Sequence, residues 1–162
     1  MKCLVTLPLI LLAAVALRAE PEYPEIGPDI YNPKADGFTL IAAALEKAKA
    51  ENKMVLLDFG ANWCPWCHKL YRTLTTTKIL AEKLASSYVV VMIDVNTRKG
   101  MKRNAEVNTN YGDPTHEGLP ALVVLDAGGN QLVTQETGAL ESGDHHDTAK
   151  VLAFLHKWAP RR

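Results

Sequence analysis

The chain has 162 residues, a formal net charge of zero and 48% hydrophobic residues. This length fits a single domain, and the balanced charge gives no argument for a nucleic-acid partner. Three cysteines are too few for a disulfide-stapled secreted scaffold, because such scaffolds usually carry several pairs that lie far apart in sequence.

Residues 1–19 have the pattern of a secretory signal peptide. A positive charge near the start precedes a long apolar run, and small residues surround a cleavage site after Ala19. The run is too short to span a bilayer comfortably, which argues against an uncleaved membrane anchor. We therefore expect an exported protein with no stable membrane insertion after cleavage. Cys3 would leave with the signal, so the mature chain would retain only Cys64 and Cys67.

Residues 20–35 contain four prolines and few large aliphatic residues, which indicates an extended lead segment. We expect the folded domain over residues 36–162. Asp36 can cap a helix over residues 37–52, in which the apolar residues share one face. Residues 54–59 form a short apolar run that is typical of a buried strand.

The next helix is expected to begin at the cysteines, because Pro65 suits a first helical turn. Three threonines at residues 75–77 should interrupt it before a second helical piece over residues 78–86. Residues 88–95 are nearly all apolar or β-branched, which predicts a central strand covered on both faces.

The C-terminal half alternates between short elements. We expect a short helix over residues 101–110, a strand over 121–125 and a turn at 127–130 into a strand over 131–135. A final helix is expected over residues 144–158. The order of these elements predicts an α/β domain with a mixed sheet.

The motif Trp-Cys-Pro-Trp-Cys at residues 63–67 carries the chemistry. At a helix start, unpaired backbone N–H groups and the positive end of the dipole would stabilise a Cys64 thiolate. Cys67 lies one helical turn further on, where it can attack a mixed disulfide at Cys64. Asp58 ends the preceding apolar strand, and burial would raise its pKa and suit it to exchange protons with Cys67. An ordinary water-facing aspartate is the alternative.

The sequence Asp-Phe-x-Ala-x-Trp-Cys-x-x-Cys, over residues 58–67, resembles the active-site signature of thioredoxins. Tyr-Gly at residues 111–112 and Gly-Leu-Pro at residues 118–120 resemble the segment that contains the family's cis-proline. These landmarks occur in family order, together with Gly-Ala-Leu at residues 138–140. The chain departs from a plain thioredoxin because Pro-Trp replaces Gly-Pro between the cysteines and Val90 replaces a frequent lysine.

The resemblance implies a thioredoxin fold, with a central mixed β-sheet flanked by helices. It also implies a thiol–disulfide oxidoreductase in which Cys64 attacks a protein disulfide, Cys67 resolves it and Asp58 moves the proton. No dissociable cofactor would be needed, because the electrons reside in the cysteine pair. Protein disulfides would be the substrates, and a separate thiol–disulfide partner would reset the pair.

The resemblance further implies a substrate surface around the cysteines. Pro120 should face them in a cis peptide, and the backbone of Leu119 could pair with an extended substrate. Trp63 and Trp66 should flank the site as an apolar landing surface. The likeness favours the periplasm and a reductant. The proline directly after Cys64 and an oxidising compartment favour the opposite direction.

Two other functions remain open on the residues alone. A copper(I)-handling module would use Cys64, Cys67 and His68, and a binding or chaperone module would keep the fold but use the tryptophan surface. We predict no metal site. Other polar residues are expected at the solvated surface: His68, His145 and His146 at a helix start, and the basic cluster of Arg98, Lys99, Lys102 and Arg103.

Overall fold

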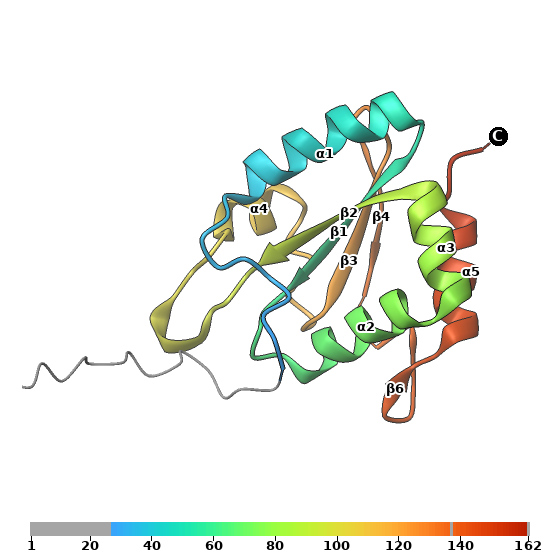
Figure 1. Cartoon of the computed structure of the whole chain (residues 1–162). Coiled ribbons are helices and arrows are strands. Elements are labelled where there is room, and N and C mark those ends of the chain that lie inside the picture. The colour runs from blue at the N-terminus through green and yellow to red at the C-terminus, as the bar shows by residue number, and fades with distance from the viewer. Residues whose placement is uncertain (1–26, 137, 162) are drawn as a thin grey trace, which may run out of the picture.

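The computed structural model describes residues 27–136 and 138–161 (Figure 1). The expected signal peptide, its cleavage site after Ala19 and residues 20–26 of the lead segment lie outside this range. Within the described part, no helix is long and apolar enough to cross a membrane. The helices and strands in chain order are α1 (Gly37–Glu51), β1 (Met54–Gly60), α2 (Pro65–Thr76), α3 (Lys78–Ser87), β2 (Tyr88–Asp94), the 3-10 turn η1 (Arg98–Gly100), α4 (Ala105–Asn110), β3 (Ala121–Leu125), β4 (Gln131–Gln135), β5 (Glu141–Ser142), β6 (His145–His146) and α5 (Thr148–Lys157).

Local sequence explains where several helices begin and end. The Asp36 carboxylate accepts a hydrogen bond from the backbone N–H of Thr39 and caps α1, as expected. Asn52 ends that helix in the left-handed conformation. The backbone of Thr77 is extended and separates α2 from α3, which confirms the predicted break at the threonine run.

The main sheet has the strand order β2-β1-β3-β4. Strand β1 pairs parallel with β2 and antiparallel with β3, and β3 pairs antiparallel with β4. The sheet is therefore mixed, and β3 and β4 are joined by the predicted turn. This arrangement confirms the expected fold class, a central mixed β-sheet flanked by helices.

Helices cover both faces of the sheet: α1 and α4 lie on one side, and α2, α3 and α5 lie on the other (Figure 1). Alternate residues of β1 enter the two cores. Leu57 packs in the cluster that contains Ile41 of α1, whereas Leu56 packs in the cluster that contains Leu70 and Leu155. Because β1 is buried on both faces, a polar side chain near its end is removed from water.

The prediction of a central strand over residues 88–95 is wrong. In the described chain β2 pairs only with β1, so it forms an edge of the sheet, and β1 and β3 occupy the centre. Val91 and Ile93 are buried on the α1 side, but Val90 on the opposite face is 38% exposed. The apolar composition of residues 88–95 reflects the burial of one face of the strand. It carries no information on whether one strand or two pair with this segment.

Two helix predictions also need correction. The final helix begins at Thr148 rather than at residue 144, because a small hairpin of β5 and β6 precedes it. The Asp147 carboxylate caps α5 by accepting hydrogen bonds from Ala149 and Lys150. Helix α4 begins only at Ala105, because the preceding residue, Asn104, has left-handed backbone.

Candidate active site

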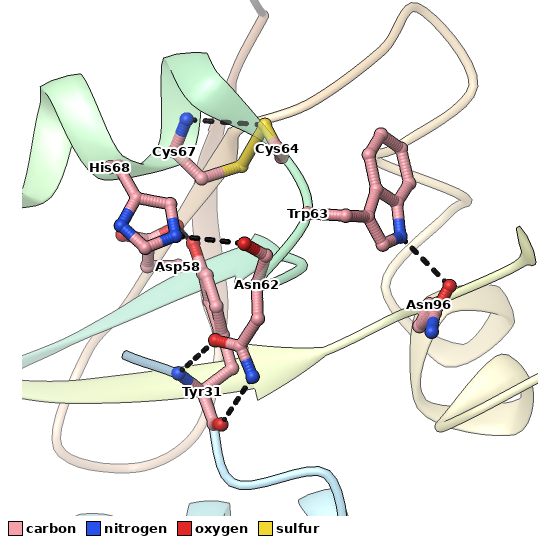
Figure 2. The surroundings of a disulfide bond; sticks show 8 residues. All are labelled: Tyr31, Asp58, Asn62, Trp63, Cys64, Cys67, His68 and Asn96. Carbon is pink, nitrogen blue, oxygen red and sulfur yellow. Dashed lines mark hydrogen bonds between the residues drawn. A yellow bond between two sulfur atoms is a disulfide. The ribbon is translucent and has the colours of Figure 1, made fainter. Parts of the chain in front are cut away.

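Cys64 and Cys67 form a disulfide at the N-terminus of α2, with their Cα atoms 5.3 Å apart (Figure 2). Cys64 is the N-cap residue, and its sulfur accepts a hydrogen bond from the Cys67 backbone N–H at 3.1 Å. Cys64 is 4% exposed and Cys67 is fully buried. The helix N-terminus therefore directs a backbone donor at the Cys64 sulfur, which favours the thiolate form after reduction.

Asp58 lies near the end of β1, on the side of the sheet covered by α2, and is 1% exposed. Burial raises its pKa to about 7, against the opposing effect of a hydrogen bond from Tyr31. The Tyr31 hydroxyl donates to Oδ1 at 2.9 Å, whereas Oδ2 is buried and has no hydrogen-bond partner among the described residues. The alternative of a water-facing aspartate is therefore wrong.

The lead segment delivers Tyr31 to the site. Asn62, two residues before Cys64, holds the backbone there: its Oδ1 accepts from the N–H groups of Ile30 and Tyr31 at 3.0 and 2.9 Å. Its Nδ2 donates to the Tyr31 carbonyl at 2.9 Å. Tyr31 is 1% exposed and packs in one cluster with both cysteines. Sequence reasoning missed both residues. Nothing local distinguishes Tyr31, whereas the place of Asn62 inside the motif was a usable signal.

His68 is also part of this buried region. It is 7% exposed, and its Nε2 lies 2.8 Å from the Asn62 carbonyl oxygen (Figure 2). The prediction of a surface histidine is wrong, because the inner face of α2 turns this side chain towards β1 and the lead segment. In the described part of the chain, no group of three or more His, Cys, Asp or Glu side chains is placed to hold a metal ion.

A groove of about 370 Å³ opens beside Cys64. It brings Trp63, Trp66 and Leu119 together with Cys64, as the resemblance implied. Its full lining is Trp63, Cys64, Pro65, Trp66, Val95, Thr97, Thr115, Gly118 and Leu119. The peptide between Leu119 and Pro120 is cis, as expected. Pro120 itself is buried and lines a different small pocket, with Leu70 and His146.

Each of the two tryptophans carries a cation on its ring. The Arg98 guanidinium lies 3.8 Å from the Trp63 ring centroid, and the Trp63 indole N–H donates to Asn96 Oδ1 at 2.8 Å. The Lys69 ammonium lies 4.3 Å from the Trp66 ring centroid. These contacts hold the indoles at the groove by cation–π attraction.

Packing modifies two further surface predictions. Arg98, Lys99 and Lys102 are exposed, as expected of a solvated basic cluster, although the Arg98 guanidinium also lies over the Trp63 ring. Arg103 departs from the expectation, because it is half-buried and pairs with the buried Asp94 at 3.3 Å. His146 lies in β6 rather than at a helix start, is 5% exposed and meets the Trp66 ring edge-on. Burial lowers its pKa to about 4, aided by the nearby positive charge of Lys69. His145 is exposed, as expected.

Comparison with known proteins agrees with this geometry. A family model described as thioredoxin-like matches residues 39–127. Thioredoxin H4 of Arabidopsis thaliana is 30% identical over 95 residues, which cover 59% of this chain and 68% of that protein. The crystal structure of a disulphide isomerase from Xylella fastidiosa Temecula1 is 34% identical with a TM-score of 0.69, covering 79% of this chain and 95% of that chain.

A longer relative shares only this domain. The thiol:disulfide interchange protein DsbD of Colwellia psychrerythraea is 33% identical over 93 residues, which cover 57% of this chain but 14% of that protein. The family match covers more than half of the chain and includes both cysteines and Asp58. The chain therefore belongs to the thioredoxin-like family and is a thiol–disulfide oxidoreductase.

Proposed function

We propose that the protein is exported to the periplasm and there reduces disulfides in other proteins through Cys64 and Cys67. The observation that carries this proposal is the division of roles around the cysteine pair. Cys64 lines the groove, whereas Cys67 is fully buried in the cluster that contains Tyr31, on the side of Asp58. One cysteine thus borders the groove, and the other is enclosed on the side of the sheet that carries Asp58.

The proposed reaction transfers two electrons. The reduced Cys64 thiolate attacks one sulfur of the substrate disulfide, which forms a mixed disulfide and releases the other substrate sulfur as a thiolate. Cys67 gives its thiol proton to the Asp58 carboxylate and attacks the Cys64 sulfur. The Cys64–Cys67 disulfide forms, and the second substrate sulfur leaves as a thiolate. The substrate is reduced by two electrons and the cysteine pair is oxidised by two.

The remaining residues position the partner. Trp63, Trp66 and the backbone at Leu119 line the groove, where they offer apolar contact and main-chain pairing to an extended segment. A dithiol protein of the same compartment resets the pair by the reverse exchange, so no dissociable cofactor takes part. The signal-like residues 1–19 and the similarity to a thiol:disulfide interchange protein support export.

The direction of electron flow rests on two features. The aliphatic Leu119 precedes the cis-proline, and Asp58 is buried so that its carboxylate is a better base than an exposed one. In the resemblance to thioredoxins both features favour a reductant, whereas the proline directly after Cys64 favours the opposite direction. Within this fold, reduction potentials span about 150 mV, so a direct measurement decides between the two directions.

The test is a glutathione redox titration of residues 20–162, followed by tryptophan fluorescence, since Trp63 and Trp66 adjoin the disulfide. A midpoint at or below about −220 mV supports a reductant, and one above about −150 mV would show a disulfide donor. A double variant, Cys64→Ser with Cys67→Ser, is the control. Partner binding that survives in this variant, without any disulfide exchange by the native protein, would point to a binding module instead.

A further inference from the structure

We propose that Tyr31 is a positioning residue for disulfide exchange: its hydroxyl holds the Asp58 carboxylate by Oδ1 and leaves Oδ2 to take the proton from Cys67. This inference rests on the proposed role of Asp58 as proton acceptor and assigns the control of that role to the lead segment. Tyr31 lies 27 residues before Asp58 and outside the family match, which begins at residue 39.

The geometry supports this assignment first through the hydrogen bond itself. The Tyr31 hydroxyl and Asp58 Oδ1 are 2.9 Å apart and buried, while Oδ2 has no partner among the described residues. A buried carboxylate with one oxygen bound and one open has a single direction in which to accept a proton. Burial and the neighbouring Asp58 raise the pKa of the Tyr31 phenol well above its ordinary value, so the phenol remains a donor.

The surroundings of Gly60 show how close the Tyr31 hydroxyl and the Cys67 sulfur lie to each other. A Cβ atom on Gly60 would overlap the Tyr31 hydroxyl and would lie 2.9 Å from the Cys67 sulfur. The phenol and the resolving cysteine therefore lie against the same point of β1, two residues beyond Asp58. Residue 60 must therefore lack a side chain for the tyrosine hydroxyl to reach the Asp58 carboxylate.

The position of Tyr31 is held independently of its hydroxyl. Asn62 makes three hydrogen bonds to the backbone of Ile30 and Tyr31, and the ring packs against both cysteines. Removal of the hydroxyl alone should therefore leave the ring and the lead segment in place. This makes Tyr31→Phe a clean variant, since it deletes a donor to Asp58 and little else.

Few other groups near Asp58 could donate a hydrogen bond to its carboxylate or change its pKa. Its direct partners on the adjacent strands are apolar, Met92 on β2 and Leu122 on β3. Among the described residues of the lead segment, β2 and α2, the titratable groups that are buried near Asp58 are Tyr31, Asp94, Cys67 and His68. Tyr88 is buried at the far end of β2, and the remaining titratable groups of these elements are exposed or only half-buried: Asp29, Lys34, Lys69, Tyr71 and Arg72. Asp94 is paired with Arg103 at 3.3 Å, and the His68 ring meets the Asn62 carbonyl, so neither replaces the phenol as the donor to Oδ1.

The experiment compares the pH dependence of disulfide reduction in the native protein, Tyr31→Phe, Asp58→Asn and Tyr88→Phe. Tyr88 is a matched control, because its buried hydroxyl also donates a hydrogen bond, to the Leu155 carbonyl at 2.8 Å, but at the opposite end of the sheet. A hydrogen bond to a charged group stabilises it enough to move a pKa by about one unit or more. Without the phenol the carboxylate is less stable, so it binds its proton more tightly.

For Tyr31→Phe we expect the acid limb of the rate profile to move up by about one pH unit, with at least a fivefold lower rate at pH 6. The carboxyl signal of Asp58 in carbon NMR should titrate at a correspondingly higher pH. Tyr88→Phe should match the native profile. A folded Tyr31→Phe variant with an unchanged profile and an unchanged Asp58 titration would overturn the role of Tyr31.

Asp58→Asn separates the two proposals. If this variant loses the acid limb while Tyr31→Phe keeps the native one, Asp58 is the proton acceptor and Tyr31 does not position it. If Asp58→Asn also keeps the native profile, the proposed role of Asp58 fails, and with it the inference for Tyr31. A higher acid limb in Tyr31→Phe, together with its loss in Asp58→Asn, supports both.

Discussion

The two sides of the Cys64–Cys67 disulfide are built in different ways. On the groove side, Trp63 and Trp66 come from the motif itself, and surface cations lie on their rings. On the inner side, Asp58 and Tyr31 are almost fully buried and are joined by one hydrogen bond. The difference teaches that the tryptophan side is built from half-buried residues of the motif itself, whereas the surroundings of Asp58 are a dry site assembled across the chain.

The largest effects are expected when each cysteine is replaced in turn, which tests whether the two sides of the disulfide have different roles. Cys64→Ser should lose disulfide reduction to the background rate, because the groove-side nucleophile is gone. Cys67→Ser should still attack and should accumulate a mixed disulfide, because nothing resolves it. Mass spectrometry of both variants, incubated with a disulfide-containing protein, measures this. Trapping by Cys64→Ser but not by Cys67→Ser would reverse the two roles.

The burial of Asp58 on the inner side should make the free energy of unfolding depend on pH. The pKa of Asp58 is raised from 3.8 to about 7, so the folded state binds a proton that the unfolded state has released. This stabilisation is fully present below about pH 4 and is lost as pH rises to about 7, with a span of up to about 4 kcal/mol. Urea unfolding of the oxidised protein and of Asp58→Asn across this range checks it.

The lowered pKa of His146, which packs against Trp66, should change the free energy of unfolding with pH in the opposite direction. Its pKa is lowered to about 4, so its contribution is present above its ordinary pKa of 6.5 and is lost as pH falls towards 4. In Asp58→Asn the stability should therefore rise with pH over this interval, where the native protein falls or stays level. If the unfolding free energy of the native protein and of Asp58→Asn changed with pH in parallel, the raised pKa of a buried Asp58 would be contradicted.

A substitution at Asn62 tests whether the lead segment excludes water from the surroundings of Asp58. Asn62→Ala removes three hydrogen bonds to the backbone of Ile30 and Tyr31 and should cost about 3 kcal/mol of unfolding free energy. Because burial is the main cause of the raised pKa of Asp58, that pKa should also fall. Urea unfolding and NMR titration of Asp58 measure the two effects.

Asn32→Ala is the matched control in the same segment, since its Oδ1 accepts a single exposed hydrogen bond from the Lys34 N–H at 3.0 Å. We expect it to change stability by less than about 0.5 kcal/mol. An equal loss of unfolding free energy in the two variants would show that the hydrogen bonds of Asn62 stabilise the fold no more than the exposed one of Asn32.

The smallest effect is expected on the groove side. Arg98→Ala removes the guanidinium from the Trp63 ring, and a cation–π contact at an exposed site contributes about 0.5–1 kcal/mol. The looser indole should raise KM for a protein substrate about two- to fivefold and leave kcat unchanged. Steady-state kinetics, with the exposed Lys102→Ala as control, measures this. A drop in kcat instead would place Arg98 in the chemical step.

The fold was largely readable because its signals are local. The cap at Asp36, the break at the threonine run and the continuous burial of β1 all follow from a few adjacent residues. The position of β2 at the sheet edge was not readable, since an apolar run looks the same whether one or two strands flank it. The hairpin at residues 141–146 was likewise hidden, because strands of two residues have no periodicity.

The sequence by itself determined the chemistry of this protein: a cysteine pair at a helix start, an acid at the end of the preceding strand, and aromatic residues beside both. These choices depend on spacing along one strand, turn and helix, which the chain carries within ten residues. Only the tertiary structure decided the environment of that chemistry. Tyr31 reaches Asp58 and His146 reaches Trp66 through contacts that span 27 and 80 residues, and burial at such points depends on how distant segments pack.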